Sequence, residues 1–219
     1  MPPNPTASDL PPLGRAFYDR HVVRVARDLL GTLLIRVLRG RVILGRIVEA
    51  EAYLADDDPA SHSHRGRTRR NASMFGPPGH AYVYAIHSRW CFNAVTEPTG
   101  VASAVLIRAV EPLVGVDSMR RRRRQAAVRD LARGPARLCE ALAIDRRLDG
   151  WDLTRGERLW VTAASNEHLR ALWRESPVAE IGPAAEVAVS PRVGVTAAHD
   201  LPLRFYFAGS PYVSRPARR

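Results

Sequence analysis

The sequence contains no lysine. All 33 of its Lys-plus-Arg residues are therefore arginine, and with 22 acidic residues they give a formal net charge of +11. Enzymes that attack a substrate carbon with an amine normally use a lysine side chain. Without lysine, the amino terminus is the one candidate for such an amine nucleophile. Guanidinium groups bind phosphate oxygens well, and a charge of this size favours a polyanionic partner such as nucleic acid.

Cysteines and long apolar runs are also scarce. The two cysteines, Cys91 and Cys139, provide neither a disulfide framework nor a metal-binding knuckle, and we predict that both are buried and reduced. No segment has the length of a membrane span, and the amino-terminal letters MPPNPTASDLPPLG lack the apolar run of a secretory signal. We therefore expect a cytoplasmic protein that does not associate with membranes.

Hydrophobic residues make up 46% of the 219 residues, which is enough for one ordinary core. Residues 1–14 are rich in proline and predict a mobile tail, and residues 215–219 predict a short basic tail. The folded domain is expected to span residues 15–214.

The apolar pattern predicts a mixture of helices and strands without a βαβ rhythm. Helical spacing over residues 17–30, followed by Gly31, predicts an amino-terminal helix. Two apolar, β-branched runs joined by Arg39-Gly40 predict a hairpin. The remaining predictions are strands at 80–86, 102–110, 158–162 and 203–208 and helices at 115–125 and 135–143. The expected fold is a single α+β domain, with a curved, mainly antiparallel sheet flanked by helices.

The predicted strand at 41–53 carries the first candidate chemistry. Because strand side chains alternate, Ile47, Glu49, Glu51 and Tyr53 are expected on one face. The patternless segment 54–79 follows, and irregular segments of that length are often functional. It contains side chains able to bind metal or move protons, namely Asp56, Asp57, Asp58, His62 and His64. The residues alone indicate an acidic, histidine-bearing cleft beside a basic surface.

Longer blocks of letters are more specific: IVEAEAYLADDDPASHSHRGRTRRNASMF, GHAYVYAI, CFN, AVLIRAVEP, RGPARLCEALAI, PRVGV and LPLRFYFAGSPYVS. Together they resemble the alkyladenine (3-methyladenine) DNA glycosylase family, from about residue 17 to 214. The resemblance implies a monomeric DNA repair enzyme that flips a damaged purine out of double-stranded DNA and hydrolyses its N-glycosidic bond. It implies neither a cofactor nor a catalytic metal.

The resemblance assigns three residues to catalysis. Glu51, the second glutamate of EAEAY, matches the residue that activates the attacking water. Breaking the N-glycosidic bond builds positive charge on the sugar, which a carboxylate stabilises. Arg108 matches an arginine that helps to hold this water and a nearby phosphate, and Val193 matches a position whose carbonyl contacts the water.

Four further residues are expected to form the base pocket. Tyr53 and Tyr84 match the aromatic walls, His62 matches the histidine that closes the pocket, and Asn93 matches the asparagine that limits guanine entry. Alkylated purines are cationic or electron-poor, so stacking on tyrosine favours them over normal bases.

The turn after Tyr84 departs from the family pattern. It reads AIHSRW, one residue shorter than expected, and it lacks the tyrosine that family members insert into the DNA stack. His87 is the first replacement candidate and Arg89 the second. We interpret the aspartates at 56–58 as a solvated turn and the arginines at 120–124 as a helix face near phosphate.

The residues by themselves also allow two other functions. His62, His64 and Asp58 could bind zinc or manganese in a metal-dependent hydrolase or nuclease. The charge alone also fits a basic protein that coats nucleic acid without catalysis. Within glycosylases, the missing lysine favours hydrolysis that leaves an intact abasic strand over amine attack with strand cleavage.

Overall fold

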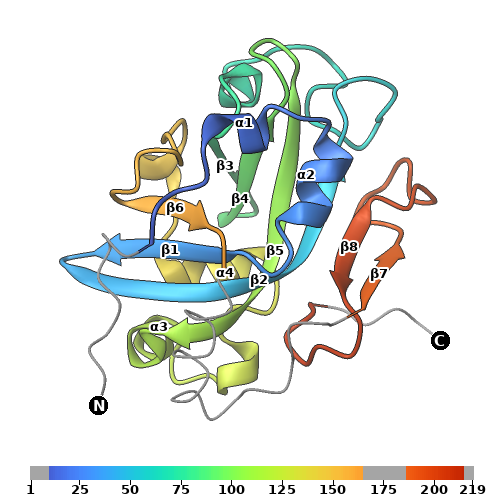
Figure 1. Cartoon of the computed structure of the whole chain (residues 1–219). Coiled ribbons are helices and arrows are strands. Elements are labelled where there is room, and N and C mark those ends of the chain that lie inside the picture. The colour runs from blue at the N-terminus through green and yellow to red at the C-terminus, as the bar shows by residue number, and fades with distance from the viewer. Residues whose placement is uncertain (1–9, 165–185, 215–219) are drawn as a thin grey trace.

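The computed structural model describes residues 10–164 and 186–214 (Figure 1). Within them, eight strands form one curled antiparallel sheet, in the order β3-β4-β5-β2-β1-β6, and β8 pairs with both β2 and β7. The strands are β1 Leu33–Leu38, β2 Arg41–Tyr53, β3 Ala81–Ile86, β4 Arg89–Thr96, β5 Ser103–Val114, β6 Leu159–Thr162, β7 Val187–Ser190 and β8 Arg204–Phe207. The expected α+β class and antiparallel sheet are confirmed.

Four α-helices lie in the described part of the chain: α1 Arg15–Tyr18, α2 Val22–Asp28, α3 Val116–Arg122 and α4 Pro135–Leu142. Short 3₁₀ turns occur at Ala72–Phe75, Val128–Asp130 and Arg146–Leu148. None of the described helices has the length and apolarity needed to cross a membrane.

Helices α2, α3 and α4 pack against the same face of the sheet. The apolar faces of these helices and the inward side chains of β2 to β5 form the main core. The expected single helix at 17–30 is wrong in detail, because the chain breaks between Tyr18 and Val22 into two short helices. Gly31 does adopt the expected left-handed backbone, with φ 84°.

The long strand β2 organises the sheet. One edge pairs with β5 along most of its length, whereas the other edge pairs with β1 over residues 41–46 and with β8 over residues 49–51. Figure 1 shows the result: β1 and the first part of β2 lie across the direction of β3 and β4, and β2 then bends to run beside β5. The site lies on the second face of the sheet, opposite the helices, where Glu49, Glu51 and Arg108 are buried.

Two β-bulges set which side chains reach this second face. Ile47 pairs with Val110 but Glu49 pairs with Ala109, so one extra residue, Val48, lies in β2. An extra residue in one strand inverts the alternation of side chains after it. Ile47 therefore packs in the main core, and the prediction that it shares a face with Glu49 is wrong. Glu49 and Glu51 stay on one face, because no further residue is inserted in β2 between them.

The second bulge lies opposite the first. Ala50 pairs with Ile107 although Glu49 pairs with Ala109, which leaves Arg108 as the extra residue of β5. The side chains of Ile107 and Val110 remain in the main core. Arg108 instead extends toward the carboxylates of Glu49 and Glu51.

Several boundaries differ from the predictions. Residues 10–14 do not form a free tail, because Leu10 is buried and its carbonyl accepts a hydrogen bond from Trp160 Nε1 at 2.8 Å. The other residues of the expected tails, 1–9 and 215–219, lie outside the described residues. Strands β4 and β7 were not among the predictions. The other predicted strands and the two later helices are confirmed within a few residues of their bounds.

Candidate active site

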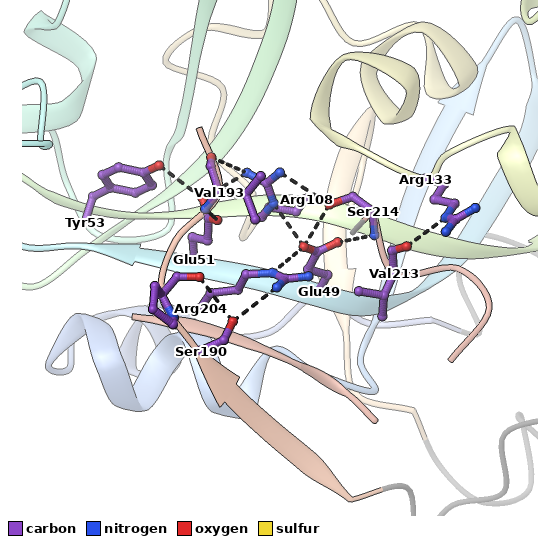
Figure 2. A network of polar contacts seen from close by, with 11 residues as sticks. Glu49, Glu51, Tyr53, Arg108, Arg133, Ser190, Val193, Arg204, Val213 and Ser214 are labelled. Carbon is purple, nitrogen blue, oxygen red and sulfur yellow. Dashed lines mark hydrogen bonds and ion pairs between the residues drawn. The ribbon is translucent and has the colours of Figure 1, made fainter. Parts of the chain in front are cut away.

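Glu51 occupies the centre of the second sheet face and is 0% exposed. Its Oε1 accepts a hydrogen bond from the backbone N–H of Val193 at 2.7 Å. Its Oε2 accepts hydrogen bonds from Arg108 Nη1 at 3.0 Å and from the Tyr53 hydroxyl at 3.1 Å (Figure 2). The structure thus joins residues that lie more than 140 positions apart in the chain.

The hydrogen-bond geometry leaves Glu51 able to bind one more donor. A carboxylate has about four acceptor positions on its two oxygens. Three are used, and Oε1 has a single partner among the described residues. Oε1 therefore keeps one acceptor position that none of the described residues fills.

Arg108 connects Glu51 to a second buried carboxylate. Its Nε donates to Glu49 Oε1 at 3.1 Å, and its Nη1 approaches the Val193 carbonyl at 3.5 Å. Burial alone would lower the pKa of Arg108, but the charges of Glu51 and Glu49 outweigh this effect and raise it. The guanidinium therefore stays charged at the bottom of the site.

The aromatic residues expected to bind a base line one cavity of about 370 Å³, which is within the usual size range for small-molecule sites. Tyr53, Tyr84, His62 and Asn93 all contribute to its wall. The His62 and Tyr84 rings already contact each other, with centroids 4.4 Å apart. The Arg192 guanidinium covers one face of the Tyr53 ring, with its central carbon 4.6 Å from the ring centroid.

Protonation of the cavity groups follows from their burial. Burial, reinforced by the charge of Glu51, raises the pKa of Tyr53, so its hydroxyl keeps the proton that it donates. Burial also lowers the pKa of His62, whose Nδ1 lies 2.7 Å from the Tyr82 hydroxyl. A neutral imidazole beside the cavity does not repel a cationic purine.

The sequence is similar to a family of known proteins over most of its length. Residues 16–211 match the model of the family described as Methylpurine-DNA glycosylase (MPG). The chain belongs to this family. Relatives named "Putative 3-methyladenine DNA glycosylase" include one from Carboxydothermus hydrogenoformans, 46% identical over 93% of this chain and 98% of its own length. Others are from Methanoculleus marisnigri, 48% identical over 93% and 98%, and Koribacter versatilis, 45% identical over 97% of both chains.

Membership of the methylpurine-DNA glycosylase family implies a DNA substrate, and the residues expected to contact DNA lie in the hairpin between β3 and β4. His87 and Ser88 form a two-residue turn with φ 46° and 63°, which places His87 and Arg89 at the exposed tip. Ile86 was not predicted as a site residue. It is 46% exposed although it is a large apolar side chain, and it lines the 370 Å³ cavity. The sequence did contain a signal for Ile86, because it places a large apolar residue at the end of a strand, directly before a polar turn.

Grooves with arginine side chains flank this hairpin. One, of about 610 Å³, is lined by Arg89, Arg123 and Arg124, and another, of about 1030 Å³, is lined by Arg65, Arg69, Arg70 and Arg146. A third, of about 570 Å³, contains Arg108, Arg133 and Arg137 together with Val193 and Tyr53. This third groove also includes Ile86, so it extends from the hairpin to Arg108 and Val193, two partners of Glu51.

The arginine run at 120–124 is only partly available to these grooves. Arg122 donates to the Ala141 carbonyl at 2.8 Å, and Arg123 donates to the Leu131 carbonyl at 3.1 Å. These contacts connect α3 to α4 and to the segment before α4. Both side chains therefore have partners within the protein, although Arg123 also lines the 610 Å³ groove beside the hairpin, and the interpretation of the run as a helix face near phosphate stays a prediction.

Asp58 also departs from its interpretation as part of a solvated turn. Its carboxylate forms two 2.6 Å hydrogen bonds with Arg192, and both side chains are 0% exposed. It further accepts hydrogen bonds from the backbone N–H groups of Leu54 and Ala60. This ion pair fastens the start of the long loop to the residue before Val193.

The alternative metal site is not supported by this geometry. Its proposed ligand Asp58 is fully engaged by Arg192. Across the described ranges, no group of three or more His, Cys, Asp or Glu side chains is arranged to hold a metal ion.

Proposed function

We propose that this chain excises alkylated or otherwise damaged purines from double-stranded DNA by hydrolysis, as a step of base excision repair. The observation that carries the proposal is the environment of the Glu51 carboxylate. Its carboxylate is buried and held by three donors, retains an acceptor position on Oε1, and lies beside an aromatic cavity.

In the proposed reaction, the damaged nucleotide is flipped out of the duplex and its base enters the aromatic cavity. The bond between the sugar C1′ and the purine nitrogen breaks, and the bonding electrons leave with the base. Positive charge develops on the sugar, where the negative charge of Glu51 stabilises it. A water on Oε1 gives its proton to Glu51 as its oxygen bonds to C1′.

Selectivity for damage is proposed to come from the ring system of the cavity. A cationic or electron-poor purine stacks more strongly on the tyrosine rings that line the cavity than a normal purine does. Asn93 is 3% exposed and donates to the Tyr82 carbonyl at 3.0 Å, so its position is fixed. A fixed side chain at the floor of the cavity can exclude bulkier guanine substituents.

The product is expected to be an intact strand with an abasic site. Strand cleavage through a covalent intermediate requires an amine, and no lysine exists in the sequence. Borohydride should therefore trap no protein–DNA adduct, and the strand should break only after alkali treatment. An adduct that maps to the amino terminus would contradict simple hydrolysis.

The central experiment uses duplexes with one defined lesion each, such as hypoxanthine, ethenoadenine or 7-methylguanine, in the presence of a chelator. Wild type should release the base from at least one of them under single-turnover conditions. Glu51→Gln keeps the side-chain shape but cannot accept the water proton, so release should fall by about 10²- to 10⁴-fold while the duplex still binds.

Glu111→Gln is a matched control. Glu111 is also a fully buried carboxylate on the β2–β5 pair, but its partner is Arg46 and it does not contact Glu51 in the structure. It should release base at the wild-type rate per folded molecule. Normal turnover by Glu51→Gln would refute the assignment of Glu51, and damage-independent binding without release would indicate a coating protein instead.

A further inference from the structure

Glu49 is a buried carboxylate beside Glu51 that accepts four hydrogen bonds, and the proposed reaction does not use it. Its side chain is 0% exposed. Oε1 accepts from Arg108 Nε at 3.1 Å, Arg204 Nε at 2.7 Å and Ser214 Oγ at 2.9 Å. Oε2 accepts from the Ser214 backbone N–H at 2.6 Å. Figure 2 shows Glu49 at the centre of this network, on the side of Arg108 away from Tyr53.

The contacts of Arg108 divide between the two carboxylates. Its Nε faces Glu49 and its Nη2 donates to Ser214 Oγ at 3.3 Å, while its Nη1 faces Glu51. A guanidinium is planar and rigid. Fixing Nε and Nη2 therefore also fixes the direction in which the Nη1 hydrogens point.

Charge balance makes this arrangement possible. Two buried carboxylates, Glu49 and Glu51, are matched by two buried guanidinium groups, Arg108 and Arg204. Arg204 donates to Glu49 Oε1 through its Nε, and its Nη1 donates to Ser190 Oγ at 3.1 Å. Glu49 therefore does not depend on Arg108 alone for neutralisation, and Arg108 remains available to Glu51.

We propose that Glu49 is a positioning residue for the reaction: it orients Arg108, and through Arg108 the carboxylate of Glu51. This inference rests on the proposed function. Among the described residues, the hydrogen-bond donors to Glu49 are Arg108, Arg204 and Ser214, so we expect it to act through Arg108 and not on the substrate. Its removal should therefore slow the chemical step without weakening substrate binding.

The test measures single-turnover base release at several enzyme concentrations, which separates the maximal rate from the half-saturating concentration. Glu49→Gln is expected to lower the maximal rate about 10- to 100-fold, because a small displacement of a reacting group has effects of this size. The half-saturating concentration should stay within about twofold of wild type, since positioning acts on the transition state.

Two further variants separate positioning from general damage to the fold. Glu111→Gln also converts a buried, arginine-paired glutamate of the same strand pair to an amide, and it should leave the maximal rate unchanged per folded molecule. In an Arg108→Gln background, Glu49→Gln should cause no additional loss, because its effect passes through Arg108. If Glu49→Gln does not fold, Glu49→Asp replaces it, and its shorter carboxylate should give a smaller loss of maximal rate.

The outcomes are distinguishable. A wild-type maximal rate in a folded Glu49→Gln or Glu49→Asp protein overturns the inference and leaves the proposed function standing. An equal loss in Glu111→Gln, or a fully additive loss in the Arg108→Gln background, also overturns it. A wild-type protein that releases no base from any lesion overturns the proposed function and this inference together.

Discussion

The buried ion pair between Asp58 and Arg192 gives the sharpest stability prediction. Asp58→Asn retains the size of the side chain but removes its charge. The amide can accept one hydrogen bond from Arg192 and presents N–H donors where the second carboxylate oxygen was. An uncompensated guanidinium, 0% exposed, then remains next to Tyr53.

The magnitude follows from this burial. Removing one partner of a buried ion pair destabilises a protein by about 3–5 kcal/mol. For a chain of this length, 1 kcal/mol corresponds to roughly 2–4 °C in Tm, so Asp58→Asn should lower Tm by roughly 6–20 °C. The loss should be large because the same carboxylate also accepts from the backbone of Leu54 and Ala60.

The assay is urea unfolding followed by tryptophan fluorescence, with thermal unfolding as a second measurement. Asp145→Asn is the matched control. Asp145 also forms a two-pronged pair with an arginine, with contacts of 3.0 and 2.6 Å, but the Arg147 side chain is 77% exposed. Exposed pairs contribute little, so this variant should lose far less stability than Asp58→Asn.

The pH dependence tests whether charge causes the effect. Burial would raise the pKa of Asp58, but hydrogen bonds and the charge of Arg192 outweigh it and hold the pKa below its ordinary value of 3.8. A carboxyl group with a depressed folded-state pKa stabilises the fold above its unfolded pKa and loses this effect as pH falls through the folded pKa. The difference between wild type and Asp58→Asn should therefore be constant near neutral pH and shrink below about pH 4. A loss at neutral pH no greater than that of Asp145→Asn would refute the reasoning.

Three further predictions concern the DNA-facing surface and the cysteines. Ile86→Ala and His87→Ala should reduce base excision more at fully paired lesions than at mismatched lesions, because unstacking a paired site costs a few kcal/mol. Equal losses at both kinds of site would exclude insertion of these side chains into the base stack. Binding should weaken with salt, with a log–log slope of about −4 to −5 for five phosphate contacts, whereas a slope near zero would contradict a duplex-binding surface. Burial raises the pKa of the Cys91 and Cys139 thiols, so a thiol-labelling reagent should modify both slowly until urea unfolds the protein. Rapid labelling of the native protein would contradict the burial of these thiols.

Much of the fold could be predicted because its signals are local. The Arg39-Gly40 turn between two β-branched runs forms the β1–β2 hairpin, with both residues at positive φ. Pro135 begins α4 as its sequence position suggested. The helix at 17–30 failed because its apolar spacing continues across a break in the backbone, which the spacing alone does not reveal.

The candidate site was predicted as a set of residues but not as a geometry. The structure does bring Glu51, Tyr53, Arg108 and Val193 together. The hydrogen bond from the Val193 N–H group to Glu51 was not predicted, and the expected contact of its carbonyl with the water stays a prediction. The ion pairs of Arg108 with two carboxylates were not predicted, and its expected role near water and phosphate stays a prediction.

The sequence by itself determined the residue types that the chemistry needs, the absence of a lysine amine, the positive charge and the antiparallel hairpins, because each depends on composition or on neighbours in the chain. Only the tertiary structure decided that Ile47 belongs to the core, that Asp58 is buried and that Glu49 shares Arg108 with Glu51. The bulges at Val48 and Arg108 arise from how β2 and β5 pair across about 60 residues of chain. A one-residue shift in such a pairing moves side chains to the opposite face, and this shift has no local signature in either strand.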